Sequence, residues 1–433
     1  MEALSLEDLR ETDGRSLHFT PYGFGGPIAP EEALAFQQHV IGQHSLADDV
    51  AEGTRRRFEQ LRHVYRYGLL CYDLFTMVSD AALLVFEQAL RDRFVEFYGG
   101  TVTFRDSCRQ EHDITFQNYA DFMAQFKARG GTKIKMGSDR RWTGFNGMLD
   151  GLYRWARREG LLRGQRNRSR EPVFKELRNM VAHPSGFHLD SPADAARRMS
   201  DLAETINQLW GSPTPGGRLH PAPVERQPVA IGCNDAGSIT ICQAASLHTA
   251  DGTDGWEFVL VQAVFSPGES EDPTLTQFDA LFENTTYPCD LMWGPGMRAE
   301  ALAWLETAQP GPDTRDHLDP VFLLRYDGKS LHLPQRPEVA AGLPSAATTG
   351  TWFAIRADAP SDAFVHVREL ITQTATRHAA AGECQQCAAD TLKRGTWEQA
   401  LAAAERAGAS GTPEQLVDVR TPSWMPRKVA IDS

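Results

Sequence analysis

The chain has 433 residues, more than one hydrophobic core usually supports, so its length predicts two or three domains. Apolar residues make up 41% of the sequence, and no apolar run approaches the ~18 residues that span a bilayer, which argues against a membrane protein. Seven cysteines, an odd number spread along an acidic chain of net charge -13, argue against a secreted disulfide framework. We expect a cytoplasmic protein with reduced cysteines.

Charge is distributed unevenly along the chain. Residues 1–220 hold 29 basic and 29 acidic side chains, whereas residues 221–433 hold 15 and 28. Within the neutral half, residues 127–178 carry 15 basic and 5 acidic side chains. Such a stretch is typical of a surface that binds a phosphate backbone, and it fits a solvated helix face equally well. The candidate RNA-binding residues are Arg154, Arg157, Arg158, Arg163, Arg166, Arg168 and Arg170.

Residues 31–212 are predicted to form a helical bundle that follows an acidic extension of residues 1–30. Apolar residues recur at helical spacing in residues 79–98, and the pair Gly99 and Gly100 closes that helix. Residues 114–131 and 143–162 predict two more helices. Ser191 as N-cap, with Pro192 at the first helical position, predicts another up to Trp210.

The segment "REPVFKELRNMVAHP" predicts a helix that carries an unusual polar cluster. Pro172 lies near its first turn, and Pro184 disfavours helical geometry at His183, where the helix should stop. Asn179 and His183 are four residues apart and share a face, whereas Arg178 lies roughly 100° around the helix. Arg178 and His183 therefore meet near a helix terminus.

A proline- and glycine-rich stretch, residues 213–228, predicts a linker, and residues 229–433 predict an α+β domain with a largely antiparallel sheet. Short apolar runs bounded by turn residues indicate strands, and Asp327-Gly328 indicates a hairpin. Helical patterns return in residues 364–382 and 395–409, where Thr396 and Gln399 match a capping box.

The cluster of Arg178, Asn179 and His183 has the parts required for metal-independent RNA cleavage. A permanently charged guanidinium can hold the scissile phosphate, and an imidazole that titrates near neutrality can move protons. Asparagine can orient either group. The same residues also fit a plain helix C-terminus, where the helix dipole favours cationic side chains.

In this region the sequence resembles the HEPN superfamily. The family motif is R-x(4 to 6)-H on the penultimate helix of a small helical domain, and "RNMVAH" matches it with four intervening residues. Many members carry an E-x-x-x-[KR] pair on an earlier long helix, which Glu87 and Arg91 of "EQALR" match. The resemblance covers about residues 50–212, and an insertion of about residues 99–140 separates the two motifs.

The resemblance implies a homodimer in which two motif-bearing helices form one cleft that cuts RNA such as tRNA without a metal. Arg178, His183 and Asn179 would be catalytic, and Glu87 and Arg91 would line or brace the cleft. An ordinary ion pair at i and i+4 is the alternative role of the last two. The role that the resemblance implies is a toxin or antiphage effector. The acidic second half of the chain suggests in addition that the C-terminal domain regulates this activity through a protein or ligand trigger. The competing hypothesis is an inactive dimerisation and nucleic-acid-binding module with a partner-recognition domain.

A second candidate site lies in "HAAAGECQQC". His378, Cys384 and Cys387 are three residues of the types that ligate zinc, and the cysteines have the C-x-x-C spacing of a zinc knuckle. A fourth ligand is not evident in the sequence, although folding could bring in Cys233, Cys242 or Cys289. No glycine-rich phosphate loop, G-x-S-x-G elbow or H-E-x-x-H helix is present, which argues against the commonest nucleotide hydrolases, esterases and zinc proteases.

Overall fold

The computed structural model describes residues 5–18, 27–137, 140–182, 188–212, 224–249, 252, 254–263, 290–316, 318–372, 377–409 and 428–431. The chain forms two compact units, which we call unit 1 and unit 2. Unit 1 comprises Met1–Arg163 and Arg170–His220, and unit 2 comprises Gly164–Ser169 and Pro221–Ser433. The predicted order, helical first and α+β second, is confirmed.

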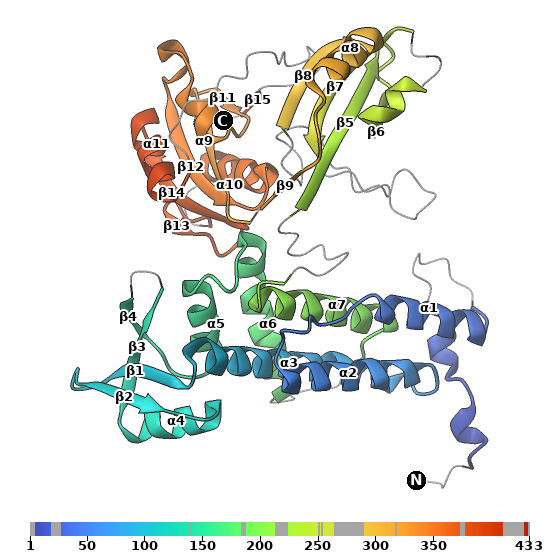
Figure 1. Cartoon of the computed structure of the whole chain (residues 1–433), viewed down its shortest axis with the longest axis vertical. Coiled ribbons are helices and arrows are strands. Elements are labelled where there is room, and N and C mark those ends of the chain that lie inside the picture. Colours follow the sequence, from blue (N-terminus) through green and yellow to red (C-terminus); the bar gives the residue numbers. More distant parts are fainter. Residues whose placement is uncertain are drawn as a thin grey trace. The chain divides into compact units, whose positions relative to one another are not determined.

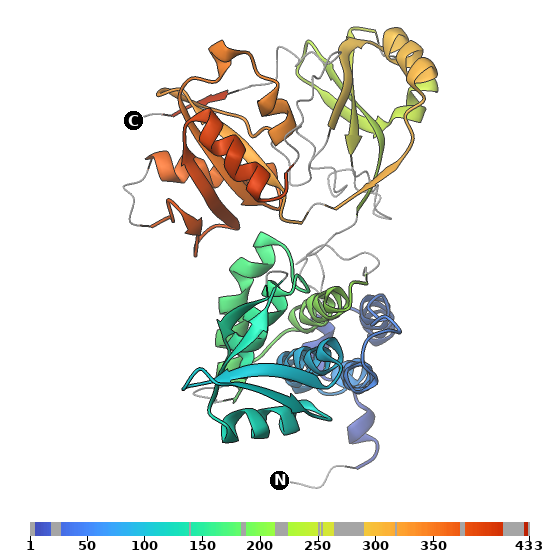
Figure 2. The ribbon, with the colours of Figure 1, turned by 60° about the vertical axis from the view of Figure 1, so that its left-hand side comes forward.

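Unit 1 is built around the long helix α3 (Asp73–Tyr98). Helices α2 (Glu52–Arg66) and α7 (Pro192–Leu209) pack against α3, and α1 (Pro30–Gly42) contacts both of them. Figures 1 and 2 show these four helices running alongside one another. Fully buried side chains of α2 and α3 belong to one continuous apolar core, including Phe58, Phe75, Val78, Ala89 and Phe94. Short 3-10 helices lie at Asp8–Arg10, Gly14–His18 and Tyr67–Leu69.

The prediction that residues 31–212 are helical is wrong for residues 101–115 and 131–144. They form an antiparallel sheet of order β2-β1-β3-β4, made of β1 (Thr101–Asp106), β2 (Glu111–Thr115), β3 (Gly131–Met136) and β4 (Arg141–Gly144). The helix expected at residues 114–131 is reduced to α4 (Tyr119–Ala128). Val102 and Phe104 alternate with more exposed residues along β1, the period-2 pattern of a half-buried strand. These strands are too short for that alternation to stand out in the sequence.

The local signals that mark helix ends are confirmed. Gly99, with φ of 57°, caps α3 in the left-handed conformation that glycine adopts without strain. Ser191 accepts a hydrogen bond from the Asp194 backbone N–H in a reciprocal capping box at the start of α7. At the start of α11 (Trp397–Arg406), Thr396 accepts from the Gln399 backbone N–H, 3.4 Å away, which is one of the two bonds of the predicted capping box.

Helix α6 (Gln165–Ala182) carries Arg178 and follows α5 (Leu149–Arg158). The expected start near Pro172 is wrong, because Pro172 lies inside α6 and the helix begins seven residues earlier. A carboxylate distant in the sequence caps that start: Asp358 accepts from the backbone N–H groups of Gln165 (3.0 Å) and Arg166 (2.9 Å). Gly164, with φ of 95°, precedes the helix and donates its N–H to Asp319 at 3.1 Å.

Unit 2 contains an antiparallel sheet of order β13-β14-β12-β10-β11-β15 with helices on both faces. Phe322, Leu324 and Phe353 pack with α10 (Pro360–Thr372) on one face, whereas Leu323 and Trp352 pack with α9 (Pro337–Ala341) and α11 on the other. Burial on both faces explains the continuous apolar runs of these strands. The strands are Val321–Tyr326 (β10), Ser330–His332 (β11), Thr351–Ala357 (β12), Gly382–Glu383 (β13), Ala389–Gly395 (β14) and Lys428–Ala430 (β15). The predicted Asp327-Gly328 hairpin joins β10 to β11.

A second antiparallel sheet of unit 2 has the order β6-β5-β7-β8, and β9 pairs with β5. Its strands are Val224–Asn234 (β5), Ile239–Gln243 (β6), Trp256–Ala263 (β7), Asp290–Met297 (β8) and Asp313–Arg315 (β9). Helix α8 (Arg298–Ala308) and the 3-10 helix Ala244–His248 pack against one face, and a further 3-10 helix lies at Ser345–Ala347. Of the predicted linker, residues 213–223 lie outside the described residues, and the remainder starts β5.

Replacing Asp358 with alanine should weaken the first turn of α6. The substitution removes the acceptor of three backbone N–H groups, since Asp319 also donates to this carboxylate at 3.1 Å. We expect the free energy of unfolding to fall by about 1–3 kcal/mol and the Gln165 and Arg166 amides to exchange faster, measured by hydrogen–deuterium exchange. The exposed Asp254→Ala variant controls for the charge change. Unaltered exchange in the Asp358 variant would contradict the capping role.

Candidate functional site

The two sequence motifs of unit 1 meet on the carboxylate of Glu87. This residue lies in α3 and is only 6% exposed. Its Oε2 accepts hydrogen bonds from Nε (2.9 Å) and Nη2 (2.8 Å) of Arg178, and its Oε1 accepts one from Nη2 of Arg91 (2.5 Å). A buried carboxylate therefore binds one arginine of its own helix and one from a helix 91 residues further along the chain.

Aromatic packing places α6 where Arg178 can reach α3. Phe174 of α6 lies 6.4 Å, between ring centroids, from Phe86 of α3, which also packs on Tyr153 of α5 at 5.4 Å. Phe174 and Arg178 are one helical turn apart, and Phe86 and Glu87 are adjacent, so the aromatic contact sets up the ion pair. Two further ion pairs hold α6 to α5: Arg157 with Glu171 (2.6 Å) and Lys175 with Asp150 (3.0 Å).

Glu87 fixes the orientation of the Arg178 guanidinium. Nε and Nη2 face the carboxylate, and Nη1 donates to Oδ1 of the exposed Asn179 at 3.4 Å. The Arg178 side chain keeps 26% of its surface exposed. Its Nη1 edge, beside Asn179, is thus the part that can meet a ligand. His183 directly follows the last residue of α6 in the chain and lies outside the described residues, so the structure brings together Glu87, Arg91, Arg178 and Asn179.

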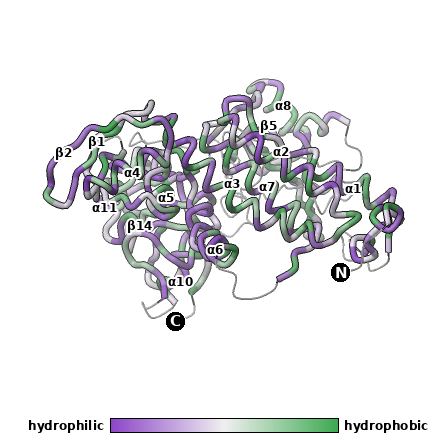
Figure 3. The backbone as a smooth tube through the Cα atoms, turned by 90° about the horizontal axis from the view of Figure 1, so that it is seen from below, coloured by the Kyte–Doolittle hydropathy of each residue, from purple (hydrophilic) through white to green (hydrophobic). Residues whose placement is uncertain are grey.

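Helix α6 buries very little of its own surface. Between Arg166 and Val181 no residue is buried, although the helix has 18 residues. Val173 (55% exposed) and Met180 (38%) are seven residues apart on one side of α6, as are Met77 (61%) and Leu84 (48%) on α3. In Figure 3 the tube of α6 carries both hydrophilic and hydrophobic segments. Helices in proteins derive most of their stability from packing, so both motif helices leave apolar side chains available for a partner.

The seven arginines predicted to bind RNA do not form a free basic stripe. In unit 1, Arg154 pairs with Asp150 (3.1 Å) and Arg157 pairs with Glu171. In unit 2, Arg166 pairs with Asp362 (2.8 Å) and Arg168 pairs with Glu383. Arg163 is half-buried, whereas Arg158 and Arg170 are exposed. Carboxylates thus neutralise at least four of these arginines, and Arg158 and Arg170 remain the most accessible.

A pocket of about 650 Å³ lies between α6 and α7. Both signs of charge line it, with Arg170 from α6 and Arg198 and Asp201 from α7 among the lining residues. Burial raises the pKa of Asp201 to about 6, and the positive charge of Arg170 opposes that shift. Leu177, the residue before Arg178, also lines the pocket, so the pocket adjoins the Arg178 turn of α6.

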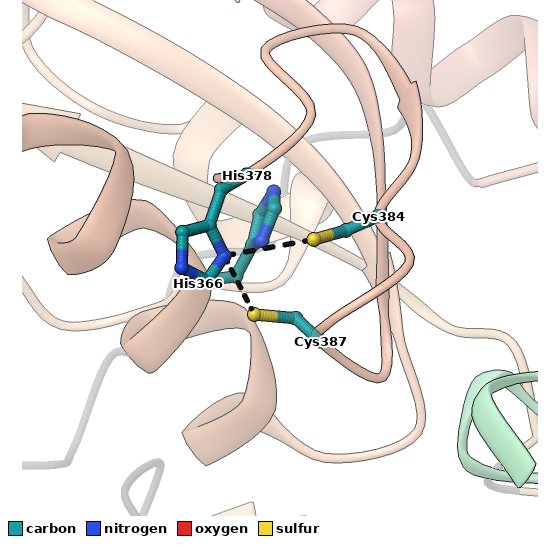
Figure 4. A group of neighbouring side chains, drawn as sticks. All are labelled: His366, His378, Cys384 and Cys387. Carbon is teal, nitrogen blue, oxygen red and sulfur yellow. Dashed lines mark hydrogen bonds between the residues drawn. The ribbon is translucent and has the colours of Figure 1, made fainter. Parts of the chain in front are cut away.

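In unit 2 the three predicted metal ligands lie together, and His366 joins them. One potential ligand atom from each of His366, His378, Cys384 and Cys387 lies within 4.8 Å of all the others. Nδ1 of His378 is 3.1 Å from Sγ of Cys387 and 3.6 Å from Sγ of Cys384, as Figure 4 shows. The suggested fourth ligands Cys233 and Cys242 belong to the β6-β5-β7-β8 sheet and are not in this group, and Cys289 lies outside the described residues.

Burial perturbs the protonation of this cluster. Burial, and after it the neighbouring His378, lowers the pKa of His366 to about 4, so this imidazole is neutral near neutral pH. Burial, followed by the neighbouring Cys384, raises the pKa of Cys387 to about 12. The described cysteines form no disulfides. His366 was missed in the sequence because "FVHVREL" reads as an ordinary half-buried helix, and no spacing rule connects it to His378.

None of the described helices has the length and apolar composition needed to cross a membrane. The chain matches no protein-family model, no curated protein and no solved structure.

The two arginines should contribute unequally to the Glu87 network. Arg178 is 26% exposed and contacts Glu87 through two nitrogens, whereas Arg91 is 46% exposed and contacts it through one. Double-mutant cycles with Glu87→Gln, Arg178→Met and Arg91→Met should give a coupling energy of about 1–3 kcal/mol for Glu87 with Arg178 and below about 1 kcal/mol for Glu87 with Arg91. Urea denaturation measures both values, and equal couplings would refute the assigned geometry.

Proposed function

We propose that this protein is a metal-independent endoribonuclease of the HEPN type. One observation carries the proposal: the E-x-x-x-R residues of α3 and the arginine of the R-x4-H motif of α6 share one buried carboxylate, Glu87. An isolated i, i+4 ion pair on α3 would not require Arg178. The contact therefore favours a joint role of the two motifs, in agreement with the resemblance.

In the proposed mechanism, Arg178 binds the scissile phosphate. Glu87 holds its guanidinium through Nε and Nη2, which leaves Nη1 and the exposed Asn179 to contact phosphate oxygens. A preoriented cation stabilises the negative charge that develops on the phosphorus oxygens. His183 would take the proton of the ribose 2′-hydroxyl or give one to the leaving 5′-oxygen. The products are a 2′,3′-cyclic phosphate and a 5′-hydroxyl, and no metal is required for this chemistry.

The active form in this proposal is a homodimer of the helical unit. The exposed apolar residues of α3 and α6 support pairing, because an 18-residue helix without a buried residue from Arg166 to Val181 leaves its apolar side chains to be covered by a second copy. Two copies would bring two Arg178–His183 sets into one cleft for RNA.

The proposed role is that of a cytoplasmic toxin or antiphage effector that cuts RNA such as tRNA. Unit 2 would regulate it in response to a protein or ligand trigger, since its sequence is strongly acidic while the helical half is neutral. The alternative function is an inactive module that dimerises and binds nucleic acid.

Purified full-length protein should cleave total RNA or tRNA in the presence of a chelator. Arg178→Ala should reduce the cleavage rate by about 10²–10³-fold through loss of phosphate stabilisation. His183→Ala should reduce it by about 10²–10⁴-fold through loss of proton transfer. Gel analysis measures the rates, and end-group analysis identifies the cyclic phosphate.

Matched controls separate a lost active site from a lost fold. Arg56→Ala and His63→Ala replace exposed residues of α2 and should leave the rate unchanged. Circular dichroism checks that every variant, and the chelated wild type, is folded. RNA binding without cleavage by folded wild-type protein supports the inactive module, and cleavage retained by both active-site variants rejects the proposed site.

A charge on the apolar side of α6 should separate the subunits. Met180→Asp introduces a carboxylate at a residue that is 38% exposed on the motif helix, so we expect monomers and loss of RNA cleavage. Sedimentation velocity measures the oligomeric state. Met148→Asp, at a methionine 66% exposed just before α5, is the control and should remain dimeric. A wild-type protein that cuts RNA as a monomer would rule out the composite cleft.

A further inference from the structure

We propose that His366, His378, Cys384 and Cys387 bind one zinc ion, which holds α10 to the hairpin of β13 and β14. The four side chains come from two separate parts of unit 2. His366 lies on α10, and the two cysteines lie in the turn between β13 and β14. Their ligand atoms converge within 4.8 Å of one another (Figure 4).

The spacing of the ligand atoms fits a tetrahedral metal. Zinc binds sulfur at about 2.3 Å and nitrogen at about 2.0–2.1 Å, so two of its ligand atoms lie about 3.3–3.8 Å apart in a tetrahedron. Nδ1 of His378 lies 3.1 Å from Sγ of Cys387 and 3.6 Å from Sγ of Cys384. These separations need only small adjustments to surround one ion.

The hydrogen bonds of His366 leave one nitrogen for a metal. The Thr391 hydroxyl donates its single proton to the Ala379 carbonyl (3.2 Å), so it must accept from Nε2–H of His366, 2.8 Å away. With the proton on Nε2, Nδ1 of His366 carries a free lone pair. This atom is buried and has no hydrogen-bond partner among the residues that the structure describes. Metal-binding histidines usually have this arrangement, in which the second nitrogen is held by a polar neighbour.

The ligand set selects zinc and a structural role. Two thiolates and two imidazoles form the Cys2His2 set of structural zinc sites, and soft sulfur ligands disfavour magnesium and calcium. Four protein ligands fill a tetrahedral ion, so no position is left for water or substrate. His366 is fully buried and Cys384 is 6% exposed, which also argues against a catalytic site that substrates must enter.

The chain segment around the four ligands has little regular secondary structure to stabilise it. β13 contains only Gly382 and Glu383, and the described residues between α10 and β13 belong to neither a helix nor a strand. Such a short strand contributes little stability by itself. A zinc ion that joins the turn to α10 would supply the missing cross-link, as structural zinc does where a small core cannot.

The same two elements also contact the first turn of α6 within unit 2. Asp362 of α10 pairs with Arg166, and Glu383, the residue before Cys384, pairs with Arg168. Zinc would thus fix the carboxylates that receive these two arginines. Loss of the metal should therefore be detectable as faster amide exchange in residues 164–169 as well as in the hairpin.

The test is the metal content of the full-length protein, purified without an affinity tag and under reducing conditions. Inductively coupled plasma mass spectrometry should find about one zinc per chain, as expected for a closed four-ligand site. Cys384→Ser, Cys387→Ser and His378→Ala should lose the metal, whereas Cys233→Ser, at a cysteine outside the cluster, should keep it. Thr391→Val, which removes only the bond that positions His366, should weaken zinc affinity by about 10–100-fold.

Substitution of cobalt into the wild-type protein tests the metal site even if a variant fails to fold. Thiolate-to-cobalt absorption bands typical of tetrahedral coordination, together with slower amide exchange of the hairpin and of residues 164–169 when metal is restored, would support the site. Wild-type protein that is purified without metal and takes up neither zinc nor cobalt would overturn it. Zinc retained in full by Cys384→Ser, or a Cys384–Cys387 disulfide under the same reducing conditions, would do so too.

Discussion

The position of α6 depends on charged contacts together with the aromatic contact of Phe174 with Phe86, rather than on a buried apolar stripe. Most helices are held by a buried apolar stripe, but α6 has no buried residue between Arg166 and Val181. Within unit 2, Asp358 and Asp319 hold the N–H groups at its start, and within unit 1 Glu87 holds Arg178 near its end. Directional bonds fix orientation more strictly than apolar contacts, which would suit the proposed binding of a phosphate by the Arg178 guanidinium.

The parts of the fold that short-range chemistry decides could be predicted from the sequence. Gly99, Ser191 and Thr396 act on backbone groups within a few residues, so their helix ends were visible in advance. The apolar runs of β10 and β12 indicated strands because both of their faces are buried. The start of α6 was not predictable, since its cap, Asp358, lies 193 residues beyond Gln165. The inserted sheet escaped prediction because each strand offers only two or three inward-facing residues.

The candidate sites could likewise be predicted only in part. The resemblance of two short motifs suggested Arg178, Asn179, Glu87 and Arg91, and the structure brings these four together. The direct bond from Arg178 to Glu87 depends on how α3 and α6 pack, and residue spacing in the sequence does not reveal this packing. His366 was not predicted for a related reason: its role follows from the single proton of Thr391, a hydroxyl 25 residues away that gives no signal in the sequence. The paired arginines could not be recognised from a count of charges, because a count does not show which carboxylate meets which arginine, and two of the partners, Asp362 and Glu383, lie far along the chain.

The division of α6 between the two units limits how the molecule can be dissected. The chain passes from unit 1 to unit 2 at Arg163, returns after Ser169 and leaves again at His220. A single cut in the proline-rich stretch therefore never yields both units intact, because the N-terminal fragment retains residues 164–169 and the C-terminal fragment lacks them. The shorter fragment would be left with Asp319, Asp358 and Asp362 but without the backbone and arginine donors they bind. A synthetic peptide or a circularly permuted gene would be needed to restore residues 164–169 to the C-terminal fragment.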